Sequence, residues 1–197
     1  MQDLVLELTA ATLTTASVLT AIRERWTTWL YAAGSALLYL YVYYAAGLHV
    51  SAQMQFVYLG LSAYGLYKWR RSEKGGKAAG AERVKWASRP VRLAAMGILL
   101  GLMGVLYYLN QGSAGAEYVL YDAFLVSASV TAQGLMTRKY VECWALWVVV
   151  NIGYLPLLFA GELWFTLAVY MFLFYFTVKG AREWYQQLNS VNQVTPV

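Results

Sequence analysis

Long apolar stretches alternate with short polar ones along the whole chain. Seven of these stretches approach the roughly 20 residues that a helix needs to cross a bilayer. We expect transmembrane helices at about residues 4–22, 27–46, 50–68, 92–109, 119–137, 143–160 and 163–181. The pattern therefore predicts an all-α integral membrane protein with seven transmembrane helices.

The basic residues support this assignment, because all fifteen Lys and Arg then fall on one side of the membrane. The other side carries acidic residues on or near its loops, among them Glu7 and Asp122. The positive-inside rule places the basic side in the cytoplasm, with the N-terminus outside and the C-terminus inside. A wrong helix count would scatter the charges between the two sides.

Composition agrees, since 60% of the 197 residues are hydrophobic and 13% are charged, which excludes an ordinary soluble domain. The net charge of +5 follows from the cytoplasmic loops, so we expect no nucleic-acid partner. The first apolar stretch ends at Arg23 and Arg25 without a small-residue cleavage site, so no cleavable signal is expected. The single Cys143 excludes an internal disulfide.

An internal repeat appears when the chain is shifted by about 115 residues. The shift aligns Trp29 with Trp144, Tyr39 with Tyr154 and Gly65 with Gly180. Both copies begin outside, so we expect two parallel three-helix repeats joined by a linking helix. The expected divisions are a first repeat (1–69), a basic linker (70–91), the linking helix and outer loop (92–118), a second repeat (119–184) and a cytoplasmic tail (185–197).

Candidate binding residues are polar or aromatic side chains at mid-helix depth. Trp144, Trp147 and Asn151 have the i, i+3, i+7 spacing of one helix face. An amide in a membrane helix has to face protein or a cavity, so this face indicates either a binding site or packing between helices. Repeat-built transporters bind substrate between their halves, which favours a binding site.

The sixth helix has a counterpart in the third, where Gln55, Tyr58 and Ser62 share the same spacing. No charged residue is expected at mid-depth in any helix, so the site suits a neutral or cationic organic solute, which aromatic faces attract. It does not suit a metal ion, and proton coupling is not expected. No catalytic or cofactor motif is present, so we expect neither an enzyme nor a bound cofactor.

Glu7 and Asp122 are expected near the outer ends of the first and fifth helices. They are either a repeat-related pair of gating acids or ordinary acids at helix N-termini, where the helix dipole favours negative charge.

The chain resembles the PnuC family of bacterial vitamin transporters. The residues that carry the resemblance are the stretch 136–142, Trp144-x-x-Trp147 with Asn151, and Gln55 with Tyr64-Gly65, Trp69 and the spacing to Glu7. The resemblance implies a SWEET-like arrangement of three, one and three helices, often assembled as a homotrimer in the bacterial inner membrane. It also implies facilitated diffusion of a vitamin, which a separate cytoplasmic kinase then traps by phosphorylation.

Three departures from the family's nicotinamide riboside carriers bear on the substrate. Cys143 and Ser62 stand where those carriers have or often have Asn, and Leu66 stands where they have Trp. We therefore include Cys143 among the candidate substrate-binding residues and expect thiamine, as in the family's PnuT-like branch. Nicotinamide riboside is the alternative. An intramembrane enzyme and a structural membrane protein are the remaining alternatives.

Overall fold

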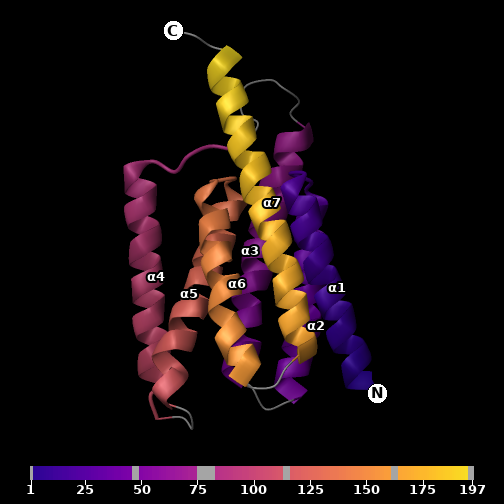
Figure 1. Ribbon diagram of the computed structural model, residues 1–197, viewed down its shortest axis with the longest axis vertical. Coiled ribbons are helices and arrows are strands. Elements are labelled where there is room, and N and C mark those ends of the chain that lie inside the picture. Colours follow the sequence, from indigo (N-terminus) through magenta and orange to yellow (C-terminus); the bar gives the residue numbers. More distant parts are fainter. Residues whose placement is uncertain (1, 46–48, 75–82, 113–115, 161–163, 195–197) are drawn as a thin grey trace.

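The structure, a computed structural model, describes residues 2–45, 49–74, 83–112, 116–160 and 164–194. Seven helices run through the described residues, and each predicted span overlaps one of them (Figure 1). They are α1 (Gln2–Ile22), α2 (Thr27–Ala45), α3 (His49–Lys74), α4 (Arg89–Asn110), α5 (Ala116–Thr137), α6 (Glu142–Ala160) and α7 (Trp164–Val194). The prediction of seven helices is confirmed. The described part contains no strand, and a single parallel bridge links Lys85 to Tyr140.

Six of the helices form a closed ring. Following the contacts around it, α1 packs on α2, α2 on α3, α3 on α5, α5 on α6, α6 on α7, and α7 on α1. The fourth helix stands outside this ring and packs on α5, as Figure 1 shows at its edge. Ser88 occupies the N-cap position of α4 without a side-chain capping bond, and Pro90 occupies the first turn, where a missing N–H costs no helical hydrogen bond.

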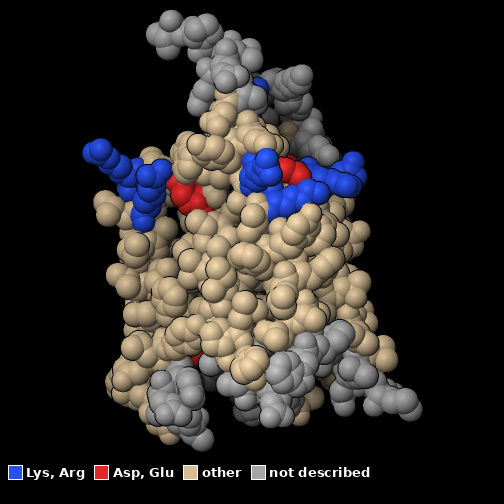
Figure 2. All heavy atoms as spheres, in the orientation of Figure 1, with Lys and Arg blue, Asp and Glu red and all other residues tan. Residues whose placement is uncertain are grey.

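Charged side chains gather at one end of the ring. Figure 2 shows Lys and Arg in a band at that end, above a broad uncharged belt. We call it the basic end; it holds the turns between α1 and α2 and between α5 and α6, with Arg23, Arg25 and Arg138. Within the described residues, Arg89–Asn110 and Val119–Thr137 are by length and hydropathy alone able to cross a bilayer.

Four buried Trp side chains fill the ring at the basic end. Trp29 meets Trp69 edge-to-face with ring centroids 5.3 Å apart, and Trp144 meets Trp184 in the same way at 5.4 Å. A Cβ atom at Gly65 would overlap the ring of Trp29. Edge-to-face pairs add about 0.5–1.5 kcal/mol beyond the area they bury. The four rings therefore make a rigid apolar cluster, the tryptophan cluster.

Two indole N–H groups tie the helices across the ring. Trp69 donates to the carbonyl oxygen of Thr137 at 3.1 Å, and Trp184 donates to that of Ile22 at 3.2 Å. Each bond satisfies an orphan carbonyl at a helix C-terminus. Because Trp69 lies on α3 and Thr137 ends α5, while Trp184 lies on α7 and Ile22 ends α1, the bonds join helices from different halves of the chain.

A partly buried ion pair lies at the same end. Lys139 Nζ is 2.8 Å from Glu24 Oε2, and it also lies 4.9 Å from the centroid of the Trp69 ring. Both residues lie in the left-handed region of backbone conformation, with φ of 52° at Glu24 and 54° at Lys139. This conformation lets each turn reverse direction within a few residues and brings the two side chains together.

The linker before α4 is fastened to the turn between α5 and α6. The N–H of Lys85 donates to the carbonyl of Lys139, and the N–H of Val141 donates back to the carbonyl of Lys85, both at 3.1 Å. Glu142 accepts from the N–H of Ala87 at 3.0 Å and pairs with Arg92 at 2.9 Å. Much of the predicted linker, residues 75–82, lies outside the described residues.

Candidate functional site

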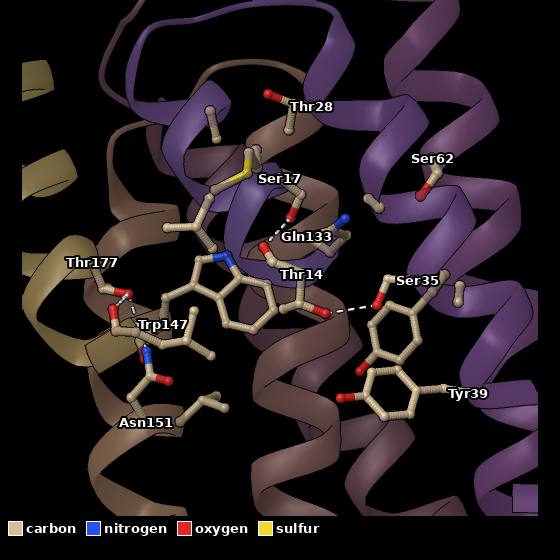
Figure 3. Close-up of a pocket in the computed structure, with 18 of the residues that line it drawn as sticks. Thr14, Ser17, Thr28, Ser35, Tyr39, Ser62, Gln133, Trp147, Asn151 and Thr177 are labelled. Carbon is tan, nitrogen blue, oxygen red and sulfur yellow. Dashed lines mark hydrogen bonds between the residues drawn. The ribbon is translucent and has the colours of Figure 1, made fainter. Parts of the chain in front are cut away.

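A cavity of about 230 Å³ lies inside the ring of six helices (Figure 3), and Trp144 of the tryptophan cluster is part of its lining. Every helix of the ring contributes to its lining, and α4 contributes none of the described lining residues. None of these residues is Lys, Arg, Asp or Glu. The polar and aromatic ones are Thr14, Ser17, Thr28, Ser35, Tyr39, Gln55, Tyr58, Ser62, Gln133, Trp144, Trp147, Asn151, Tyr170 and Thr177.

Trp147 and Asn151 lie together on the wall that α6 and α7 form, with Thr177 beside them (Figure 3). The Asn151 amide nitrogen donates to the carbonyl of Trp147 at 2.9 Å and to the hydroxyl of Thr177 at 3.1 Å. The first partner can only accept, which fixes the orientation of the amide. Both amide hydrogens are thus used within the protein, so the oxygen is the group that Asn151 offers to a ligand.

The α3 wall carries the other predicted set. Gln55, Tyr58 and Ser62 all line the cavity, with Gln55 and Ser62 buried. The Tyr58 hydroxyl lies 2.6 Å from that of Ser129 on α5. The Ser62 hydroxyl is buried and has no hydrogen-bond partner among the described residues.

Of the two remaining predicted binding residues, Trp144 lines the cavity and Cys143 does not. Trp144 closes the cavity toward the tryptophan cluster. Cys143 is fully buried in the core beneath the basic end and is absent from the described lining. The reason is helical geometry, since one residue of difference turns a side chain by about 100°.

The predicted gating acids are not part of the described lining. Asp122 lies on α5, where the Tyr154 hydroxyl approaches its Oδ1 at 3.5 Å. Glu7 is in α1, and its side chain lies outside the described residues. Their gating role stays a prediction.

The α1–α2 wall was missed by sequence reasoning. It contributes Thr14, Ser17, Thr28 and Ser35 to the cavity. Ser and Thr are common in membrane helices and often bond a carbonyl one turn back, so nothing singled these four out. A signal did exist, because Thr28, Ser35 and Tyr39 are spaced i, i+7, i+11 along one face of α2.

The arrangement favours binding over catalysis. Among the described residues, no group of three or more His, Cys, Asp or Glu could hold a metal ion. The lining combines aromatic faces, amides and hydroxyls, which is the composition of a site for a small organic molecule.

Comparison with known proteins agrees with this geometry. The family model described as nicotinamide mononucleotide transporter matches residues 4–186. The chain belongs to this family. The resemblance to the PnuC family is thereby confirmed.

Relatives in the family carry names of two vitamins. The nicotinamide riboside transporter PnuC of Neisseria mucosa is 32% identical over 60% of this chain and 46% of its own length. PnuC of Escherichia coli is 24% identical over 73% of this chain and 69% of its own length. The riboflavin/roseoflavin transporter RibM of Streptomyces davaonensis is 27% identical over 68% of this chain and 63% of its own length. The match thus spans less than half of the first of these relatives.

A solved family member has the same fold. The crystal structure of the vitamin B3 transporter PnuC superposes with a TM-score of 0.71 at 25% identity, over 94% of this chain and 82% of that one. None of these relatives carries thiamine in its name, so the comparisons do not support the expected thiamine.

Proposed function

We propose that this protein carries a vitamin made of a flat aromatic ring joined to a ribose or similar polyol, with nicotinamide riboside as the first candidate. The observation that carries the proposal is the closed ring of helices around a cavity lined by Trp147 and Asn151 without charge among the described lining. The names of the relatives support the choice of vitamin.

The hydrogen-bonding capacity of the cavity supports an unphosphorylated substrate. Asn151 offers an oxygen, because both of its amide hydrogens are used internally. A phosphate group needs donors and positive charge, and the described lining supplies no Lys or Arg. A pyridinium ring joined to a carboxamide is cationic and offers N–H donors, so Trp147 can attract the ring while Asn151 accepts from the amide.

The transport mechanism we propose is alternating access by two three-helix halves, α1–α3 and α5–α7. Residues 115 apart occupy matching places around the ring: Trp69 bonds the end of α5 as Trp184 bonds the end of α1. These bonds and the Glu24–Lys139 pair hold the halves together at the basic end. Opening that end requires breaking them, which makes them the basic-end gate of the proposal.

The charge distribution along the sequence supports the proposed orientation in the membrane and the absence of ion coupling. The basic end faces the cytoplasm by the positive-inside rule, in the bacterial inner membrane. Without ionisable groups in the described lining, substrate moves down its gradient with no coupled ion, and phosphorylation by a cytoplasmic kinase traps it. The homotrimer that the resemblance implies stays a prediction, which the mass of the detergent-solubilised protein would test.

The decisive experiment is a binding series on the purified protein with nicotinamide riboside, riboflavin, thiamine and nicotinamide mononucleotide. We expect nicotinamide riboside to bind most tightly. Replacing Trp147 by Ala removes a cation–π contact worth about 2 kcal/mol and weakens binding roughly thirtyfold. Asn151→Leu leaves a ligand donor unpaired, at about 1–3 kcal/mol.

Trp86 provides the matched control. It is half exposed, packs on Tyr185 at the basic end and is absent from the described lining. Trp86→Ala should bind like the wild type. Tightest binding of thiamine would reverse the choice of vitamin, and binding of none of the four ligands would overturn the proposed function.

A further inference from the structure

Four hydroxyl side chains line the side of the cavity formed by α1, α2 and α3. They are Thr14, Ser17, Ser35 and Ser62, which we call the hydroxyl wall. A fifth, Thr28, also lines this side but donates to the hydroxyl of Thr20 and is not counted in the wall. Figure 3 shows Ser35 across the cavity from Asn151, with the Trp147 ring between the two sides. The wall therefore faces the part of a ligand that lies farthest from the Asn151 amide.

The protons of three of these hydroxyls are used within the protein. Thr14 Oγ1 and Ser35 Oγ are 2.6 Å apart and lie 3.0 and 3.1 Å from the carbonyl oxygen of Ala10. Ser17 donates to the carbonyl of Thr14 at 2.8 Å. A hydroxyl has one proton and two lone pairs. The spare capacity of this part of the wall is therefore to accept hydrogen bonds, which suits a ligand that brings O–H groups.

Ser62 adds an unsatisfied group to the same wall. Its side chain is 1% exposed, lines the cavity, and its hydroxyl has no partner among the described residues. A buried polar group without a partner is destabilising. A ligand hydroxyl at this position would both accept the Ser62 proton and donate to a neighbour on the wall, which a phosphate or an aromatic carbon cannot do.

The opposite side of the cavity offers fewer such hydroxyls. Among the described lining residues, α6 and α7 contribute one Ser or Thr, Thr177, whose hydroxyl donates to the carbonyl of Leu173 and accepts from Asn151. Position 150, which lies 115 residues after Ser35, is Val150, and both residues line the cavity. Ala32 stands on the α2 wall where α6 has Trp147. At these positions the two sides differ, with Trp147 and Asn151 on the α6 side and most of the Ser and Thr hydroxyls on the side of α1, α2 and α3. A ligand that fits both has a flat ring at one end and several hydroxyls at the other.

We propose that the hydroxyl wall of Thr14, Ser17, Ser35 and Ser62 is the subsite that binds the ribose or polyol hydroxyls of the vitamin. This inference rests on the proposed function. It makes Thr14 and Ser35 specificity-determining residues, since their paired hydroxyls present adjacent acceptors, 2.6 Å apart, to neighbouring O–H groups of a sugar. A vitamin with a single hydroxyl, such as thiamine, would leave most of the wall unused.

The test compares nicotinamide riboside with its 2′,3′-dideoxy analogue, by competition on the purified protein. The wild type should prefer nicotinamide riboside by at least tenfold, because two ligand hydroxyls are matched. Thr14→Val combined with Ser35→Ala should weaken nicotinamide riboside about tenfold and leave the dideoxy analogue within about twofold. The preference for the ribose hydroxyls would then disappear.

Thr12→Val is the matched control. Thr12 lies on the same helix, is exposed, and bonds the carbonyl of Leu8 instead of lining the cavity. It should keep the wild-type preference. Equal binding of the two ligands to the wild type, or equal weakening of both in the double variant, would overturn the inference alone. Failure of the wild type to bind nicotinamide riboside would overturn the proposed function together with the inference.

Discussion

The Glu24–Lys139 pair allows a direct test of the basic-end gate. The Lys139 side chain is 9% exposed and the Glu24 side chain 23%, with 2.8 Å between the charged atoms. Removing one partner of a fully buried pair costs about 3–5 kcal/mol, whereas an exposed pair contributes about 0.2–1 kcal/mol. Because water reaches Glu24, we take an intermediate value of about 2 kcal/mol between those limits.

That free energy is lost only from the state in which the pair is closed. Glu24→Gln should therefore shift the balance between closed and open states about thirtyfold toward an open basic end. Lys139→Gln should act in the same direction and also loses the contact with the Trp69 ring. Exchanging the charges, with Glu24→Lys and Lys139→Glu together, restores a pair and should bring the balance back toward the wild type.

Cysteine accessibility measures the opening. Thr28 lines the cavity toward the basic end, so Thr28→Cys in a Cys143→Ala background reports the arrival of a membrane-impermeant thiol reagent. In vesicles, the rate of labelling from the side of the basic end should rise at least tenfold in Glu24→Gln. Labelling from the opposite side should not rise.

The control is a second ion pair at the same end. Arg92 and Glu142 also lie 2.9 Å apart, but they join α4 to α6 and do not bridge the two halves of the ring. Arg92→Gln should leave the labelling rate unchanged. Wild-type labelling rates in both Glu24→Gln and Lys139→Gln, in protein that still folds, would refute the assignment of this pair to the gate.

Two further predictions concern stability. Gly65→Ala should lower the melting temperature of the purified protein, because its Cβ would overlap the Trp29 ring at a cost of about 1–3 kcal/mol. Gly60→Ala should not lower it, because no atom lies within 4 Å of the new Cβ. Equal melting temperatures of the two variants would contradict the packing argument. Glu142→Gln should loosen the linker, because it weakens the bonds to the Ala87 N–H and to Arg92. The expected result is faster proteolysis between residues 83 and 92. An unchanged rate of proteolysis would contradict the prediction that Glu142 holds the linker in place.

Hydropathy predicted the helices well where the membrane decides their extent. The spans expected at 119–137 and 143–160 correspond to α5 (Ala116–Thr137) and α6 (Glu142–Ala160). The C-terminal end of α7 was less predictable, since this helix continues to Val194 instead of ending near 181. Beyond the expected span, Trp184 is buried and donates to Ile22. Tertiary packing extends this helix, and packing leaves no signal in hydropathy.

The candidate site was predictable where a residue is unusual for its place. An amide and two indoles in an apolar run drew attention to α6, and the helical spacing did the same for Gln55 and Tyr58. The Glu24–Lys139 pair was not predictable, because both residues sit among other charges in short turns. The hydroxyl wall was not predictable either. Ser and Thr hydroxyls that bond a carbonyl of their own helix have the same sequence pattern whether they face lipid, protein or a cavity.

The two halves of the chain differ at several positions that line the cavity. Positions that hold the ring together keep the same residue 115 positions apart, as in Trp29 and Trp144, and as in Trp69 and Trp184. Several positions that line the cavity do not, since Ala36 corresponds to Asn151 and Ala32 to Trp147. A scaffold that opens at either end gains from two matching halves, because similar contacts must form and break at each end. A ligand with unlike ends requires unlike walls, and the differences between the halves supply them.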